Sequence, residues 1–524
     1  MHWARWGDPD QAEPLSDAAR ALVELAFGPA VEQPTTPLAD VRLPDPALDQ
    51  AMLDELRGLL GADHVRTDHE TRVRHTRGKS TLDLLRMRQG DGADAPDAVA
   101  LPADHAEVSA VVAWCGEHSV ALVPFGGGTS VVGGLAARRD GLAGVLAVDL
   151  RRLDRLVSVD AVSGTAVLEA GVLGPRAEGL LAEHGLTLGH FPQSFEYASI
   201  GGFAATRSSG QASSGYGRFD QLVVGLTVAT PIGTLELGSS PANAAGPDLR
   251  ELVLGSEGAF GVITSVTVRV RPLPETKSYA TWRFETFGEG VAALRDLAQS
   301  GTRPTVIRLS DENETALNLA DPGQVGNAGT AGCLVVTGFE GDPDTVPVTR
   351  AAVTARLTAL GGTPLGDQDG EAWATGRFKG PYLRDAMLDL GVLVETLETA
   401  TFWSNLPRLY AAVTDALTTA LNTDAGGPVV LCHISHVYET GASLYFTVAA
   451  RQDGDGLAQW SAAKAAASDA IVATGATITH HHAVGRDHKP WLAEEIGPVG
   501  VEMLRAVKAR LDPHGVLNPG ILVP

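Results

Sequence analysis

The sequence has few cysteines, few basic residues and no long apolar run. It contains three cysteines in 524 residues and no CxxC pair, so we expect no disulfide framework and a reducing compartment. Lys and Arg number 40 against 63 Asp and Glu, and the resulting net charge of −23 argues against nucleic acid as a partner. No apolar stretch has the length of a bilayer span or of a signal segment. These absences favour a cytoplasmic enzyme.

The residues that are present predict an α+β fold in several parts. Hydrophobic residues make up 44% of the chain, which is enough for a large core, and the length favours two or three domains. Helical and strand-like patterns mix throughout. The predicted segments are a helical accessory region over residues 1–94, α+β regions over 95–275 and 276–478, and a C-terminal segment over 479–524.

A few predicted elements matter for the argument below. Ser16 is placed to cap a helix over Asp17–Phe27, and a second amphipathic helix is predicted over Pro46–Leu60. An apolar strand at Val120–Pro124 runs directly into consecutive glycines. A long loop rich in Gly, Ser and Ala is predicted over Phe191–Gly217, and a strand over Ser443–Ala449.

The glycine loop after the first of these strands is a candidate phosphate site. Consecutive glycines let backbone N–H groups point at a diphosphate without interference from side chains, and the hydroxyls add donors. A tight turn between strands is the simpler alternative, because a lone glycine motif is weak. No G-x-G-x-x-G opens a helix here and no Walker lysine follows. The candidate residues are Pro124, Phe125, Gly126, Gly127, Gly128, Thr129 and Ser130.

Two further loops of small residues lie in the same region. They allow a flat ligand to approach the backbone closely, although a flexible surface loop is the alternative for the longer one. Three such loops suggest three walls of one cofactor site. The candidates are Gln193, Ser194, Phe195, Glu196, Tyr197, Ala198, Ser199, Gly201, Gly202, Thr206, Arg207, Ser208 and Ser209, then Glu257, Gly258, Ala259, Phe260, Gly261, Val262 and Ile263.

Three adjacent histidines, His480, His481 and His482, form the most unusual motif near the C-terminus. Neighbours on one strand point to opposite faces, so the run does not suit a structural zinc site, and we predict no metal. Imidazole exchanges protons near neutral pH, which favours catalysis. A satisfied structural role remains the alternative for any single histidine.

In this order the motifs resemble a known fold. The sequence resembles proteins with the FAD-binding (PCMH-type) fold of the vanillyl-alcohol oxidase type. The motifs that carry the resemblance are PFGGGTS, SIGG with TRSSG, GSEGAFGVIT and a terminal DPHGVLNPG. The resemblance implies an FAD-binding domain of two α+β subdomains over 95–275 and an α+β cap domain for substrate over 276–478. Residues 479–524 would complete the active site. Phe125 stands where members with covalent flavin usually carry histidine, which implies non-covalent FAD.

Over nearly the whole chain the sequence resembles the alkyldihydroxyacetonephosphate synthase family. The resemblance implies catalytic Tyr445, His480, His481 and His482, with Tyr445 and His481 handling proton transfer. It places Arg308, Arg384 and Thr396 in the substrate pocket, the arginines on phosphate and departing carboxylate. His190 is a weaker candidate. Three residues depart from the family pattern: Ala483, Thr396 for serine, and Gln193 for the aspartate of the animal enzymes.

The implied reaction is a transfer in ether-lipid synthesis. The acyl chain of acyl-dihydroxyacetone phosphate would be exchanged for a fatty alcohol through an adduct at flavin N5. The expected partners are this phosphate ester and the alcohol, with a homodimer and peripheral membrane contact. One alternative is an FAD-dependent D-2-hydroxy-acid dehydrogenase or oxidase. Another, of a different class, is a non-catalytic protein that binds metal through the histidine triplet.

Overall fold

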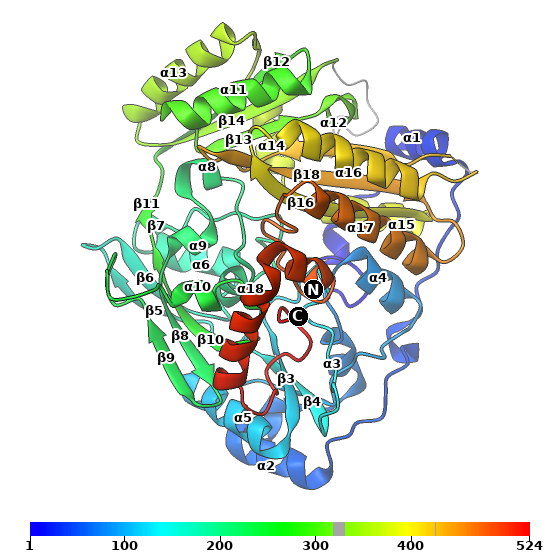
Figure 1. Ribbon diagram of the computed structural model, residues 1–524, viewed down its shortest axis with the longest axis vertical. Coiled ribbons are helices and arrows are strands. Elements are labelled where there is room, and N and C mark those ends of the chain that lie inside the picture. Colours follow the sequence, from blue (N-terminus) through cyan, green and yellow to red (C-terminus); the bar gives the residue numbers. More distant parts are fainter. Residues whose placement is uncertain (318–330, 425) are drawn as a thin grey trace.

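The computed structural model describes residues 1–317, 331–424 and 426–524. In Figure 1 the three sheets of the N-terminal half fill the lower part of the view, and a seven-stranded sheet with its helices fills the upper part. The long C-terminal helix α18 (Lys489–Leu511) lies over the lower half. Within the described residues, no helix combines the length and apolar character that crossing a membrane requires.

The first sheet carries the glycine loop. Its order is β1-β2-β4-β3, and the β2–β4 and β3–β4 pairs are parallel. Helix α5 (His105–His118), capped by Asp104, leads into β3 in a β-α-β pattern. The strands are β1 (Val65–Arg66), β2 (Ala98–Ala100), β3 (Val120–Phe125) and β4 (Gly144–Asp149). The other helices of this part of the chain are α1 (Asp17–Phe27), α2 (Gln50–Leu60), α3 (His69–Arg74) and α4 (Thr81–Arg88).

A five-stranded antiparallel sheet of order β5-β6-β10-β8-β9 and a two-stranded ribbon complete this half. The strands are β5 (Leu156–Asp160), β6 (Thr165–Glu169), β7 (Leu186–Thr187), β8 (Val223–Thr230), β9 (Gly233–Leu237), β10 (Val262–Arg269) and β11 (Arg271–Pro272). The helices are α6 (Gly174–Ala182), α7 (Ile200–Thr206), α8 (Ser213–Tyr216), α9 (Phe219–Leu222) and α10 (Arg250–Val253).

The upper half is one antiparallel sheet of order β15-β12-β14-β13-β17-β18-β16. Leucines and aromatics from one face of this sheet share a core with α11, α16 and α17. The strands are β12 (Thr276–Phe284), β13 (Val306–Ser310), β14 (Cys333–Gly341), β15 (Thr363–Gly366), β16 (Val392–Phe402), β17 (Val429–Ile434) and β18 (Gly441–Arg451). The helices are α11 (Phe287–Ser300), α12 (Glu312–Ala316), α13 (Thr345–Ala359), α14 (Gln368–Gly376), α15 (Gly380–Asp389), α16 (Leu406–Leu421) and α17 (Gly456–Ala473).

The α+β prediction is confirmed, with local corrections. Helix α1 has the predicted bounds, because the Ser16 hydroxyl accepts from the Ala19 amide. The loop predicted over Phe191–Gly217 is wrong in part, since it holds α7 and α8. The second helix begins at Gln50 rather than Pro46, because Asp49 caps it. Strands β16 and β17 were not predicted, and the domain boundaries at 94, 275 and 478 stay predictions.

Candidate active site

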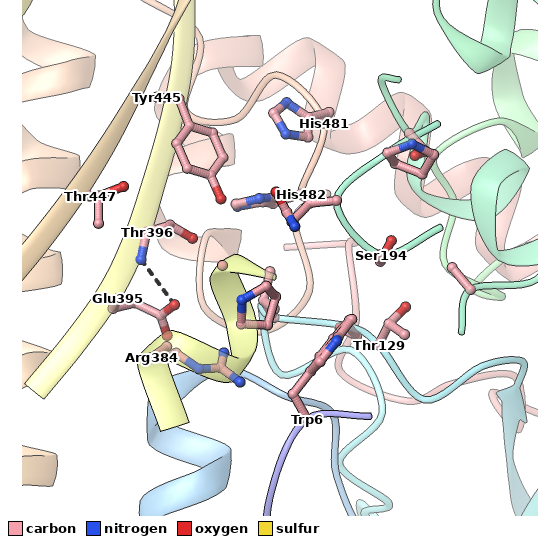
Figure 2. Close-up of a pocket in the computed structure, with 18 of the residues that line it drawn as sticks. Trp6, Thr129, Ser194, Arg384, Glu395, Thr396, Tyr445, Thr447, His481 and His482 are labelled. Carbon is pink, nitrogen blue, oxygen red and sulfur yellow. Dashed lines mark hydrogen bonds between the residues drawn. The ribbon is translucent and has the colours of Figure 1, made fainter. Parts of the chain in front are cut away.

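A cavity of about 460 Å³ lies between the two halves of the molecule. The glycine loop and the two small-residue loops form its lower walls, and the face of the seven-stranded sheet opposite α11, α16 and α17 forms its upper wall. Figure 2 shows side chains from both halves pointing into this space, with Thr129 and Ser194 on one side and Thr396 and Tyr445 on the other.

The glycine loop is packed too tightly against its neighbour for any side chain. A Cβ on Gly127 would lie 1.7 Å from the carbonyl oxygen of Tyr197, and one on Gly126 would lie 2.4 Å from Ser199 Oγ. Gly128 has φ of +72°, which favours glycine. The backbone of this loop therefore lines the cavity without obstruction, as a bound diphosphate requires.

Most of the predicted cofactor residues line the cavity, and eight do not. Those on the wall are Pro124, Gly126, Gly127, Gly128, Thr129, Ser130, Gln193, Ser194, Ala198, Ser199, Gly201, Gly202, Thr206, Ser208, Ser209, Glu257, Gly258, Gly261 and Ile263. The others lie behind it: Phe125, Phe195, Glu196, Tyr197, Arg207, Ala259, Phe260 and Val262.

The contacts of the displaced residues explain their positions. Phe125 packs on the His75 ring at 4.4 Å, and Phe195 stacks on Phe378 at 5.6 Å. Tyr197 shares a hydrogen bond of 3.2 Å with Tyr382. Arg207 pairs with Asp220 and Glu251. These side chains support the loops from behind.

The strand register builds the upper wall as three rungs. Ala449 on β18 faces Val394 of β16 and Val429 of β17, Thr447 faces Thr396 and Leu431, and Tyr445 faces Glu398 and His433. All but Glu398 line the cavity, because alternate residues of a strand share one face. The upper wall therefore changes from apolar at Ala449 to polar at Tyr445, and Thr396 lies on the middle rung.

The histidine run is fixed by a buried carboxylate that the sequence reasoning missed. Glu398 accepts the backbone N–H groups of His480, His481 and His482 at 2.6, 3.1 and 2.9 Å. These residues lie in bends and not on a strand, so the premise of alternating side chains is wrong. Glu398 falls in the segment Val392–Phe402, which is rich in Val and Thr, and this preference for strand structure was the available signal.

The three histidines have different surroundings. His481 and His482 line the cavity, whereas His480 lies behind it with Nε2 2.5 Å from the Tyr438 hydroxyl. His481 Nδ1 lies 3.3 Å from Glu398 Oε2 and 2.9 Å from His480 Nδ1. Its Nε2 has no hydrogen-bond partner among the residues that the structure describes. The ring of His481 stacks on that of Tyr445 at 6.0 Å.

Burial sets the protonation states around His481. It lowers the pKa of His482 to about 3 and raises the pKa of Tyr445 to about 12, so the first is neutral and the second protonated at neutral pH. Burial favours the neutral form of Glu398, but the neighbouring His481 outweighs this effect, and the pKa of Glu398 lies well below its ordinary value. An ionised Glu398 holds His481 in one orientation beside a phenolic donor, which suits proton transfer.

The two predicted substrate arginines line the cavity with carboxylate partners. Arg308 lies 2.5 Å from Glu314 and 3.0 Å from His433 Nδ1. Arg384 donates to the Lys79 carbonyl at 2.7 Å and lies 3.3 Å from Asp385. His190 is buried behind the wall between Phe203 and Phe219.

The N-terminal region also reaches the site. Trp6 lines the cavity, and its backbone N–H donates to Asp385 at 2.5 Å. Helix α1 contributes Ala19, Val23 and Phe27 to the same wall. The apolar face of α1 was visible in the sequence, but nothing in it indicated the partner surface.

Glu257 joins the third loop to the C-terminal segment. Its Oε2 accepts from the Val484 and Gly485 amides at 3.1 and 2.6 Å. Burial raises its pKa to about 8. The neutral form of Glu257 therefore stabilises the folded protein at low pH. This contribution to the free energy of unfolding is lost as the pH rises through about 8, where the buried carboxyl ionises.

Glu257→Gln removes this titration while keeping the acceptor oxygen. We expect the melting temperature of the variant to fall by roughly 1–3 °C less than that of the wild type between pH 7 and pH 9. Differential scanning calorimetry at both pH values measures the difference. Equal falls in the two proteins would show that Glu257 does not titrate in this range.

The known proteins that this chain resembles are FAD-binding proteins, in agreement with the geometry of the cavity. Residues 96–238 match the family model described as FAD binding domain, and residues 273–522 match FAD linked oxidases, C-terminal domain. An alkyldihydroxyacetonephosphate synthase of Trypanosoma brucei brucei is 34% identical over 92% of this chain and 82% of its own length. The chain belongs to the alkyldihydroxyacetonephosphate synthase family. The enzyme of that name from Dictyostelium discoideum is also 34% identical, over 94% of this chain and 84% of its own.

A solved alkyldihydroxyacetonephosphate synthase structure superposes with a TM-score of 0.85 at 29% identity, covering 100% of this chain and 99% of that one. The family resemblance, the flavoenzyme class and FAD as the cofactor are thereby confirmed. The roles of the individual site residues stay predictions.

Proposed function

We propose that this chain exchanges the acyl group of acyl-dihydroxyacetone phosphate for a fatty alcohol, as its relatives' name implies. One observation carries the proposal: the cavity joins the polar end at Tyr445 and His481 to an apolar limb. Successive rungs on β16, β17 and β18 are about 7 Å apart, since a strand rises about 3.4 Å per residue, so the rung of Tyr445 and the apolar rung of Ala449 are about 14 Å apart.

The apolar limb fits a hydrocarbon chain. Helix α1 closes one side and α15 the other, and most of the side chains that line the limb are apolar. Its residues are Leu15, Ala19, Leu22, Val23, Ala26, Phe27, Leu383, Met387, Val394, Val429, Leu431 and Ala449. A small hydroxy acid has no apolar group to fill such a space, so the limb favours a long-chain substrate over the hydroxy-acid alternative.

The residues present fit FAD. The unobstructed backbone of Gly126–Ser130 suits the pyrophosphate, and Ser199, Gly202 and Thr206 extend the same wall. When bound, the flavin supplies the electrophilic N5 atom that the exchange requires.

The protein groups account for the proton transfers. The exchange breaks the bond between C1 and the acyl oxygen, forms one between C1 and the alcohol oxygen, and releases a fatty acid. His481, held by Glu398 at Nδ1, accepts the substrate proton at Nε2. The Tyr445 hydroxyl stays protonated, so it can donate a proton or a hydrogen bond. Arg384 lies on α15 beside Leu383 and Met387 of the limb, where the departing carboxylate would stand.

The proposal includes ether-lipid synthesis in the cytoplasm by a homodimer in peripheral contact with a membrane. A chain-binding limb supports the membrane contact, because the alcohol must come from a lipid phase. Leu25 on α1 is 84% exposed, which gives the outer face of this helix an apolar side chain.

Anaerobic mixing tests the substrate class. Acyl-dihydroxyacetone phosphate should bleach the flavin absorbance of the purified protein and release fatty acid, whereas D-lactate and glycolate should leave the spectrum unchanged. Bleaching by the hydroxy acids without a response to the phosphate ester would instead establish the hydroxy-acid dehydrogenase. Stoichiometric metal in a colourless protein would establish the metal-binding alternative.

Filling the apolar limb should change chain-length preference. Ala449 lies on the rung farthest from Tyr445, so Ala449→Phe places a ring across the limb. We expect kcat/KM for a sixteen-carbon alcohol to fall about tenfold or more, while a short alcohol is used nearly as well as by the wild type. Steady-state kinetics over a series of alcohols measures this, and a uniform loss for all lengths would contradict the placement of the chain.

The flavin should leave the protein on denaturation. The ring of Phe125 precedes the glycine loop, and the histidine packed on it, His75, has both ring nitrogens engaged, by Asp149 at 2.7 Å and the Thr71 carbonyl at 2.7 Å. We therefore expect acid precipitation to move essentially all flavin absorbance into the supernatant. Yellow colour retained in the pellet would show a covalent bond.

A further inference from the structure

One arginine on the cavity wall, Arg377, forms no ion pair with a carboxylate of the residues that the structure describes. Arg377 follows α14, and its guanidinium carbon lies 4.9 Å from the ring centroid of Phe191, 5.0 Å from that of Phe378 and 5.7 Å from that of Trp373. Three aromatic rings therefore hold the cation in place by cation–π contact without neutralising it.

Two of its three guanidinium nitrogens are also without a hydrogen-bond partner in the described chain. Nε and Nη1 of Arg377 are buried and have no partner within residues 1–317, 331–424 and 426–524. Arg308 and Arg384, in contrast, each pair with an acidic side chain. The acidic group that acts on Arg377 through space, Glu340, is itself held by the Tyr216 hydroxyl at 2.9 Å and by Lys277 at 3.7 Å.

Two glutamines that lie near the segment Arg377–Gly380 also have a buried polar atom without a partner in the described chain. Gln193 Nε2 and Gln211 Oε1 are buried without partners in the described chain, and both side chains line the cavity. Gln211 Nε2 lies 3.4 Å from the Arg377 carbonyl, and a Cβ on Gly380 would lie 3.9 Å from Gln193 Nε2. Buried donors without acceptors are costly, so the unpaired donors of Arg377 and Gln193 indicate a ligand that accepts hydrogen bonds. The Gln211 oxygen is an acceptor and would need a donor, such as a hydroxyl of the ligand.

We propose that Arg377, assisted by Gln193, binds the phosphate of the substrate. A guanidinium donates two parallel hydrogen bonds to a phosphate, and an amide N–H adds a third. The identity of the phosphate ester rests on the proposed function. This assignment gives the phosphate to Arg377 rather than to Arg308, whose charge Glu314 already balances.

The direction of α15 agrees with this assignment. Arg377 stands just before the N-terminus of the helix, and Met387, near its C-terminus, lines the apolar limb. Ten residues of helix span about 15 Å, so the phosphate and the hydrocarbon chain would occupy opposite ends of one wall, with Arg384 between them.

Calorimetric titration of the FAD-loaded protein tests the assignment without turnover. We expect dihydroxyacetone phosphate to bind the wild type, and Arg377→Met to weaken that binding tenfold or more while leaving the affinity for dihydroxyacetone and the FAD content unchanged. Arg377→Lys should restore part of the affinity, since it keeps the charge and loses the fork. The control Arg356→Met, which removes a surface pair with Asp296, should behave as the wild type.

Undiminished binding of dihydroxyacetone phosphate by Arg377→Met would overturn the inference. Loss of FAD from this variant would also overturn it, because the arginine would then hold the cofactor phosphate. If the wild type binds the ester through Arg377 but performs no exchange, the proposed function fails and the phosphate site stands. If exchange occurs but the affinity for dihydroxyacetone phosphate does not depend on Arg377, only the assignment of the phosphate site is wrong.

Discussion

His481→Ala should keep its FAD and lose turnover by about 10²–10⁴-fold, the usual contribution of a positioned general base. The reason lies in the orientation of the ring: Glu398 holds Nδ1 at 3.3 Å, which leaves Nε2 as the atom that can accept the substrate proton. The stacked ring of Tyr445 supplies the neighbouring donor, so Tyr445→Phe, which removes one oxygen, should also lose most activity while retaining the flavin.

Flavin absorbance and steady-state kinetics on the same preparation measure both effects. His118→Ala is a suitable control, because His118 lies on α5 with Nε2 2.9 Å from Glu55 and does not line the cavity. Near-normal kcat in His481→Ala would remove this residue from the reaction. Loss of the flavin together with activity would instead place it in the cofactor site.

Gly127→Ala should abolish FAD binding, the second large effect. An added Cβ would lie 1.7 Å from the backbone carbonyl oxygen of Tyr197, and backbone cannot move aside as a flexible side chain does. The glycine loop and the Tyr197–Ser199 segment would have to separate, and the backbone groups that face the cavity would lose their arrangement. We expect a colourless protein with less than a tenth of the wild-type flavin.

Gly179→Ala provides the matched control. Gly179 lies within α6, and a Cβ there has nothing within 4 Å, so the same chemical change should leave FAD content intact or slightly improve helix stability. Circular dichroism would establish that the Gly127 variant is folded. Full flavin occupancy in a folded Gly127→Ala protein would mean that this loop does not hold the cofactor.

The cofactor site was largely predictable because its signals are local. Runs of glycine after an apolar strand act through the backbone itself, and the order of three such loops carries the resemblance to FAD-binding proteins. The eight predicted residues that lie behind the wall, such as Phe125 and Arg207, share those motifs but support them structurally. A motif indicates which segment forms a wall and leaves open which side chains face inward.

The upper wall of the cavity was less predictable because it depends on strand pairing. Tyr445 was predicted on its own strand, but its rung partners Glu398 and His433 come from β16 and β17, whose pairing with β18 is set by the whole sheet. Trp6 and α1 reach the site across more than 300 residues of sequence. The isolation of Arg377 is visible only when its neighbours in space are known.

The most direct measurement of the central claim is a product assay with a labelled fatty alcohol. Purified FAD-loaded protein would be incubated with acyl-dihydroxyacetone phosphate and the labelled alcohol without an added electron acceptor. The account predicts one labelled ether-linked dihydroxyacetone phosphate and one free fatty acid for each substrate consumed. Substrate oxidation that requires an electron acceptor, with no label entering the phosphate ester, would contradict it.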